Sequence, residues 1–290
     1  MLRLSSGLLV VTAGLWLANL PTATMAPLTC AGPTPEVQLQ APNTTQRAAA
    51  AKAVQISLNV DAEVLIEDSD GKRIGFDFNR RKFVNEIPNA RAITQENSAT
   101  YVLPFDKSGR PYKVTIVGKS AAKVDVDLSM TGPGFVVGFR SVPLTSGQVQ
   151  TMSIAANGLG LSLTANQDGP TSQLFLTEQS GRDKPSYRFE VSSLLAAGKT
   201  ITVNLDIDKT RLYFKTDGAK KDSFSVKTRR TNPGGTRNLY AHQDISFGRL
   251  NSYAMDFGGW DGKSEMCFYE MCDVCDLKRC TKLGNEADVK

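Results

Sequence analysis

Residues 200–227, TITVNLDIDKTRLYFKTDGAKKDSFSVK, show the pattern that decides the fold. Apolar side chains occupy every second position from Ile201 to Ile207, and polar ones lie between them, as in a strand with one buried and one solvated face. The pattern returns at Leu212–Phe214, breaks at the turn pair Asp217-Gly218 and resumes at Phe224–Val226. Strands that are apolar on one side only need a second sheet to cover them. The stretch therefore predicts part of an antiparallel β-sandwich.

The same alternation continues on both sides of this stretch, with turn signals about every 10 residues, which is typical of an all-β sandwich. We expect a first β-sandwich over residues 54–130 and a second over residues 136–266. Residues 131–135 combine glycine and proline and are predicted as the linker between them. No fixed-period internal repeat is evident. Residues 76–98 are expected to form a long irregular loop, and Ser192–Ala197 is the one segment of the second β region with a helical pattern.

The N-terminus has the organisation of an export signal. Arg3 precedes a thirteen-residue apolar stretch, Leu8–Leu20, and small residues follow it. Thirteen residues fall short of the roughly 20 that span a bilayer as a helix. Cleavage after Ala26 or after Ala31 fits the small-residue rule, so residues 1–31 are predicted as a signal peptide. Residues 32–53, rich in Pro, Thr, Gln and Ala, are predicted as a flexible linker. The protein is therefore expected to be secreted or periplasmic, and membrane attachment would require an uncleaved leader or a lipid on Cys30.

Two stretches of the sequence resemble a known type of module. They are DSDGKRIGFDF, which begins at Asp68, and TYVLPFDKSGRPYKVTIVGKS, which begins at Thr100. These stretches, within residues 54–130, are similar to the β-sandwich accessory modules of secreted bacterial proteins, of the immunoglobulin-like or pre-peptidase C-terminal type. The positions that match the pattern of those modules are Tyr101, Gly109, Tyr112, Val114 and Ile116. The resemblance implies adhesion, spacing or stabilisation rather than catalysis.

Four cysteines close the sequence in the pattern C-x4-C-x2-C-x4-C: Cys267, Cys272, Cys275 and Cys280. In an exported protein, two disulfides that attach the tail of residues 267–290 to the sheet are the favoured interpretation. Zinc is the minority alternative, because zinc sites usually present two C-x2-C pairs and this tail has one. Redox-active thiols are a third reading. The spacing does not select a disulfide connectivity, and no other cofactor is predicted.

No catalytic residue is assigned. The chain has one histidine, His242, and no nucleophile motif accompanies it. Asp206 and Asp208 are expected to share the wet face of one strand, a spacing that a carboxylate-based hydrolase could use. Trp260 and Asp261 lie in a glycine-rich turn, where an exposed ring could stack on a sugar. A solvated sheet face and a core side chain are the structural alternatives.

The most basic segment is residues 215–237. Its cations are Lys215, Lys220, Lys221, Lys227, Arg229, Arg230 and Arg237. Four of them, Lys215, Arg229, Arg230 and Arg237, are candidates for binding a polyanion such as an acidic polysaccharide. The formal net charge of the whole chain is only +5, and few aromatic residues interleave with these cations, so a nucleic-acid partner is not expected.

The sequence thus predicts an exported, all-β, non-enzymatic binding or structural module of the envelope or extracellular space, stabilised by C-terminal disulfides. The alternatives are a metal-dependent or carboxylate-based hydrolase on a β-sandwich and a carbohydrate-binding module that uses Trp260.

Overall fold

The computed structural model of the 290-residue chain has two units, of which the second spans residues 42–290. The described residues all belong to the second unit; they are 53–59, 62–95, 98–178, 183–217, 222–246, 252–264, 266–271 and 276–277. The predicted signal peptide and all but the last residue of the predicted linker lie outside them. Within the described residues, no helix has the length and apolar character needed to cross a membrane.

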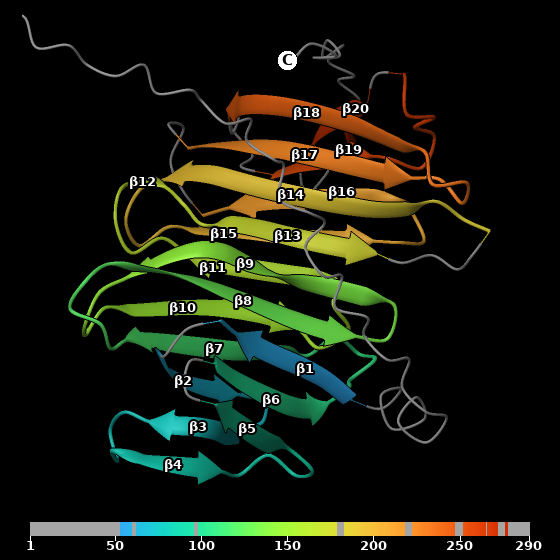
Figure 1. Cartoon of the computed structure of the whole chain (residues 1–290). Coiled ribbons are helices and arrows are strands. Elements are labelled where there is room, and N and C mark those ends of the chain that lie inside the picture. Colours follow the sequence, from blue (N-terminus) through green and yellow to red (C-terminus); the bar gives the residue numbers. More distant parts are fainter. Residues whose placement is uncertain are drawn as a thin grey trace, which may run out of the picture. The chain divides into compact units, whose positions relative to one another are not determined.

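The described chain forms two antiparallel sheets, as predicted for an all-β sandwich (Figure 1). Sheet A has ten strands, with β18-β17-β14-β13-β9-β8-β1-β6-β5 as neighbours and β12 added beside β14. Its strands are β1 (Ala53–Leu58), β5 (Arg91–Gln95), β6 (Ser98–Pro104), β8 (Val124–Gly132), β9 (Phe135–Leu144), β12 (Gly169–Pro170), β13 (Gln173–Glu178), β14 (Ser186–Leu195), β17 (Ser223–Thr231) and β18 (Arg237–Ser246).

Sheet B has eleven strands in the order β21-β20-β19-β16-β15-β11-β10-β7-β2-β3-β4. They are β2 (Ala62–Glu67), β3 (Arg73–Asp77), β4 (Lys82–Asn85), β7 (Pro111–Gly118), β10 (Val149–Ala155), β11 (Gly160–Thr164), β15 (Thr200–Asp206), β16 (Arg211–Thr216), β19 (Ser252–Asp256), β20 (Cys267–Met271) and β21 (Asp276–Leu277).

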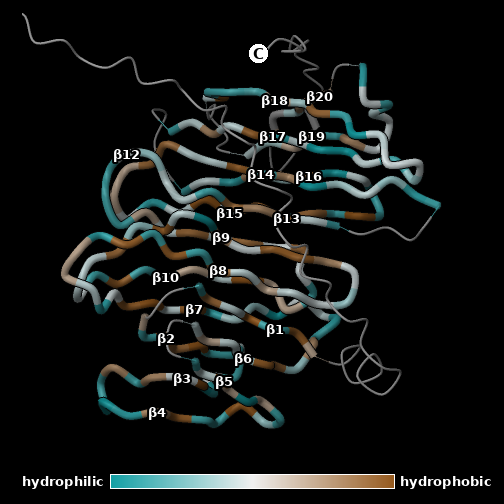
Figure 2. The backbone as a smooth tube through the Cα atoms, in the orientation of Figure 1, coloured by the Kyte–Doolittle hydropathy of each residue, from teal (hydrophilic) through white to brown (hydrophobic). Residues whose placement is uncertain are grey.

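The core lies between the sheets and follows the predicted alternation. In β15, Ile201 and Val203 are fully buried while Asn204 is exposed. Large aromatic side chains fill the middle, among them Phe139, Phe189, Phe214 and Phe224. Burying one such side chain contributes about 1.5–3 kcal/mol. Figure 2 shows the outcome along the chain, where brown and teal stretches alternate within the strands.

Both sheets run without a break across residues 131–135. β8 and β9 are paired neighbours in sheet A, and the Pro133-Gly134 turn connects them directly. One hydrophobic core includes residues from both sides of this turn, such as Ile56 and Phe214. The two predicted sandwiches therefore share one pair of sheets. The reason is physical: a glycine–proline cluster reverses the chain equally well in a hairpin and in a linker.

The chain adds hairpins to the two sheets alternately. The hairpins β8–β9, β13–β14 and β17–β18 extend sheet A, and β10–β11, β15–β16 and β19–β20 extend sheet B. The three sheet A hairpins begin at Val124, Gln173 and Ser223, which are about 50 residues apart. This regular spacing is not evident from the sequence, because equivalent strands share a hydrophobic pattern rather than residue identities.

Tight turns carry the chain from sheet A to sheet B between these hairpins. Gly147 lies between β9 and β10 with a φ of +77°, and Gly198 lies between β14 and β15 with a φ of +76°. In each turn a backbone N–H donates a hydrogen bond to the carbonyl three residues earlier. Gln148 donates to Thr145 (3.0 Å), and Lys199 donates to Ala196 (3.1 Å). Glycine adopts a positive φ at little cost, whereas other residues do not.

Two local expectations from the sequence are wrong. Residues 76–98 are not one irregular loop, because the chain forms β4 and β5 there and β3 pairs with β4 in a hairpin. Ser192–Ala197 is not helical, because β14 continues to Leu195. The end of β14 pairs with β17, about 30 residues further along the chain, whereas β4 and β5 pair with their neighbours β3 and β6. The short, mostly exposed segments of β4 and β5 lack a clear alternation, so local pattern alone underestimates the strand content.

Candidate polyanion-binding face

The candidate site is the outward face of sheet A over β14, β17 and β18. In β14, Phe189 is buried in the core, so its neighbours Arg188 and Glu190 point outward. In β17, Thr228 is buried, so Lys227 and Arg229 point outward and are exposed. Strand alternation thus places cations from two strands on one solvated surface.

The register brings these cations together. Arg188 lies directly opposite Arg229, and Glu190 lies opposite Lys227. On the other side of β17, Thr231 pairs with Arg237 of the edge strand β18, and Arg237 is exposed. Neighbouring strands are about 4.8 Å apart, so the four cations lie within a few strand widths of one another.

A fifth cation joins them through an aromatic ring. The guanidinium carbons of Arg140 in β9 and Arg188 lie 5.0 and 5.3 Å from the centre of the Phe175 ring in β13. Glu190 Oε1 accepts a hydrogen bond from Arg188 Nε at 2.8 Å and lies 3.9 Å from Arg140 Nη1. The ring and the carboxylate hold the two guanidinium groups in place, and Phe175 itself is only 6% exposed.

We call this surface the basic face and define it as Arg140, Arg188, Glu190, Lys227, Arg229 and Arg237. It combines five cations with one carboxylate. Like charges directly opposite each other in a sheet are destabilising when nothing neutralises them. Glu190 neutralises Arg188, whereas Arg229 opposite it has no carboxylate partner among the described residues. An anion that lies across β14 and β17 would neutralise Arg229.

The structure brings together only two of the four predicted polyanion residues, Arg229 and Arg237. Arg230 is on the opposite side of β17 from Arg229, and its Nη1 donates to the Asp261 carbonyl at 3.0 Å. Lys215 is exposed in β16 of sheet B, between Thr202 and Ser252. Sequence clustering fails here because consecutive strand residues point to opposite faces and because β16 and β17, though consecutive in the chain, belong to different sheets. Arg140, Phe175 and Arg188, by contrast, were not found from the sequence, since only the register reveals them.

Trp260 is a core residue. It is 4% exposed, and its Nε1 donates to the Ser264 carbonyl at 2.9 Å. Its ring meets Tyr240 edge-on with the centroids 6.2 Å apart. The indole therefore offers no surface for a sugar to stack on. Trp260 is a core side chain, which was the structural alternative for this residue.

Asp261, the neighbour of Trp260, organises the turn. Its Oδ1 accepts hydrogen bonds from the backbone N–H groups of Lys263 (2.8 Å) and Ser264 (2.7 Å). These bonds, that of Ser264 above all, lower the pKa of Asp261 to about 2. The carboxylate thus shapes the loop that contains Trp260.

Asp206 and Asp208 do not form a pair on one strand face. β15 ends at Asp206, and residues 207–210 form a turn that contains Asp208. Asp206 Oδ1 accepts the Lys209 backbone N–H at 3.0 Å, and this bond is the main cause of its lowered pKa. Among the residues that the structure describes, no group of three or more His, Cys, Asp or Glu side chains could hold a metal ion.

The cysteine motif is only partly described. Cys267 opens β20 and lies opposite Asp256 of β19, so the motif starts within sheet B and not in a tail beyond it. Cys272, Cys275 and Cys280 lie outside the described residues, as does Cys30. His242 lies in β18, and its ring centre is 6.2 Å from that of Phe268.

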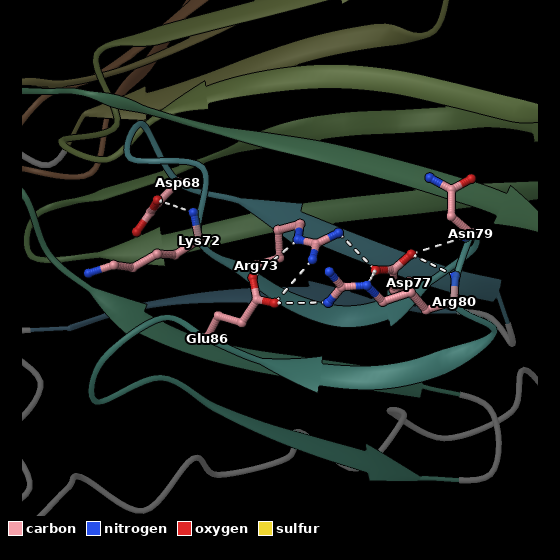
Figure 3. A network of polar contacts seen from close by, with 7 residues as sticks. All are labelled: Asp68, Lys72, Arg73, Asp77, Asn79, Arg80 and Glu86. Carbon is pink, nitrogen blue, oxygen red and sulfur yellow. Dashed lines mark hydrogen bonds and ion pairs between the residues drawn. The ribbon is translucent and has the colours of Figure 1, made fainter.

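A charged network lies at the other end of the sheets, on the β3–β4 hairpin (Figure 3). Arg73 donates two hydrogen bonds to Glu86, Nε to Oε2 at 3.2 Å and Nη2 to Oε1 at 3.0 Å, and one to Asp77 Oδ2 at 2.8 Å. Arg80 approaches Asp77 at 3.6 Å and Glu86 at 3.5 Å. Two cations and two carboxylates neutralise each other, so the network supports the hairpin and leaves no surplus charge for a ligand.

The pKa values agree with this interpretation. The backbone N–H of Arg80 is the main cause that lowers the pKa of Asp77, and the hydrogen bonds from Arg73 lower that of Glu86. Nearby, Asp68 Oδ1 accepts the backbone N–H groups of Asp70 and Lys72, both at 2.9 Å, in the β2–β3 turn. Asp68 and Asp70 thus form a turn.

Comparison with protein-family models, with curated proteins and with solved structures gives no significant match.

Proposed function

We propose that this protein is an exported, non-enzymatic binding module that holds an acidic polysaccharide of the cell envelope or extracellular space on its basic face. The observation that carries the proposal is the excess of cations there, with Arg188 and Arg229 directly opposed. Uronic acid or sulfate groups along a polymer would supply the missing negative charge at several strands at once.

The geometry of the face favours a polysaccharide over a nucleic acid. Proteins that bind single-stranded nucleic acids combine cations with exposed aromatic rings for base stacking. Phe175, the ring that packs against Arg140 and Arg188 of the basic face, is covered by them and is 6% exposed. The basic face can therefore bind a ligand mainly by charge pairing.

The test is binding of the full chain to two acidic polymers, heparin and polygalacturonate, at increasing salt concentration. The triple variant Lys227→Gln/Arg229→Gln/Arg237→Gln removes three exposed cations of the basic face. Three lost ion pairs weaken binding by about 1–3 kcal/mol, or roughly 5- to 150-fold in the dissociation constant. High salt should weaken wild-type binding in the same way.

A matched control keeps the change in net charge. Lys72→Gln/Lys113→Gln/Lys215→Gln removes three exposed lysines that lie outside the basic face. We expect this control to bind like the wild type. Equal loss in both triple variants would indicate nonspecific attraction by net charge, and no binding by the wild type would contradict the proposal.

We further propose that the four C-terminal cysteines form two disulfides that stabilise the end of sheet B, where Cys267 lies in β20. Removal of a native disulfide from a small secreted domain typically costs 2–5 kcal/mol. Intact mass before and after reduction distinguishes two bridges, seen as a deficit of four hydrogen atoms, from free thiols that hold zinc.

A further inference from the structure

A second feature with unused binding capacity is a cavity of about 170 Å³ beside the β9–β10 turn. The end of β11 and the loop that leads from β11 to β13 complete its wall. The cavity is formed by residues of both sheets and by the chain that connects them. None of the residues of the basic face lines it.

Gln150 gives the cavity a hydrogen-bond acceptor. This side chain is 6% exposed, and its Nε2 donates to the carbonyls of Thr151 (3.0 Å) and Thr164 (2.8 Å). Two carbonyl acceptors fix the orientation of the amide, so the oxygen is the atom left over. Among the described residues, none donates a hydrogen bond to Gln150 Oε1.

Ser172, another lining residue, repeats the situation. It is 8% exposed, and its backbone carbonyl accepts a bond from the Thr171 hydroxyl at 3.3 Å. The Thr171 hydroxyl is also 2.8 Å from the Ser193 hydroxyl, whereas the Ser172 hydroxyl bonds to no described residue. Neither Gln150 Oε1 nor the Ser172 hydroxyl is an enclosed polar atom, so solvent in the cavity reaches both of them. Both keep hydrogen-bonding capacity for a molecule that displaces this solvent.

The chemistry of the wall selects the ligand. Lys123 is the one ionisable side chain among the lining residues, and it is exposed. Leu163 and Pro170 add apolar surface beside the amides and hydroxyls. A water molecule occupies about 30 Å³ in the liquid, and drug-sized ligands need about 300–1,000 Å³, so this cavity suits a molecule of intermediate size. A sugar ring has the required combination of hydroxyl donors, an apolar face and no charge.

We propose that this cavity binds a single neutral sugar residue, with one hydroxyl donating to Gln150 Oε1 and another bonding to the Ser172 hydroxyl. The inference is independent of the basic face, since the two sites share no residue.

The experiment is a titration of the full chain with the methyl glycosides of glucose, galactose and N-acetylglucosamine, followed by saturation-transfer NMR. We expect at least one of the three glycosides to bind the wild-type protein, and any second glycoside that binds to compete with it for the same site. Ser172→Ala removes one hydroxyl that bonds to no described residue. It should weaken binding of that sugar about fivefold, the effect of one net hydrogen bond. The matched control, Ser162→Ala in β11, removes a hydroxyl that does not line the cavity and should bind like the wild type.

Gln150→Met is the stronger variant, since it keeps the length of the side chain and removes the acceptor. This variant also loses the two hydrogen bonds from Gln150 Nε2 to backbone carbonyls. If that loss unfolds the protein, Ser172→Ala alone provides the test. The proposal is overturned if none of the three glycosides binds wild-type protein or if Ser172→Ala binds the sugar unchanged. Loss of sugar binding at the cavity would not affect binding of heparin or polygalacturonate at the basic face. The two proposals are therefore tested independently.

Discussion

At the scale of single residues, adjacent positions in a strand have separate roles. Arg229 is on the outward basic face, while Arg230 next to it bonds to the Asp261 carbonyl. Trp260 and Asp261 differ in the same way, since one fills the core and the other organises the loop around it. A basic or aromatic residue in this sequence therefore has a predictable environment only when its face is known.

Asp261 gives a prediction on pH dependence. Its pKa of about 2 in the folded protein is below the ordinary value of 3.8, so its contribution to stability is fully present above pH 3.8 and is lost as the pH falls through about 2. Asp261→Asn should lower the melting temperature at pH 7, because the amide oxygen is a weaker acceptor for the Lys263 and Ser264 N–H groups. Thermal unfolding of both proteins from pH 7 to pH 2 checks this.

The difference in melting temperature should shrink as the pH approaches 2. A difference that stays constant down to that pH would mean that the carboxylate charge has no part in holding the turn.

At the scale of elements, the alternation of hairpins between the sheets depends on the turns that join them. Gly198 has a positive φ, and a Cβ added there would meet nothing within 4 Å. A substitution at this position therefore strains the backbone without creating a clash, which separates conformational cost from packing cost.

Gly198→Ala should reduce the free energy of unfolding by about 1–2 kcal/mol, the cost of a left-handed conformation for a residue with a Cβ. Gly234→Ala is the matched control, since that glycine also has open space around it but no positive φ. Urea denaturation measures both. Equal effects of the two substitutions would argue against a role for the left-handed turn.

At the scale of the whole second unit, strand positions and buried faces follow from alternation, as β15 and β16 demonstrate. The register and the order of strands do not, because they depend on partners far away in the chain. For this reason the sequence predicted a sandwich and two residues of the basic face, Arg229 and Arg237, but neither the Arg140–Phe175–Arg188 cluster nor the continuity of the sheets across residues 131–135.

That continuity predicts cooperative unfolding. Because one hydrophobic core joins residues before and after 131–135, the unit should unfold in a single transition rather than in two. Val54→Ala in β1 and Val226→Ala in β17 remove methyl groups from fully buried positions of sheet A, one before and one after residues 131–135. Both should shift the same transition in differential scanning calorimetry, and two separable transitions would contradict the shared core.

The measurement that tests the central claim most directly is arginine labelling by phenylglyoxal, read by peptide mass spectrometry, with and without bound heparin. The account predicts that heparin protects Arg229 and Arg237, while the exposed Arg91 of β5 and Arg110 before β7 react at unchanged rates. Protection of Arg91 and Arg110 with continued labelling of Arg229 and Arg237 would place the polyanion elsewhere and contradict the basic face as its site.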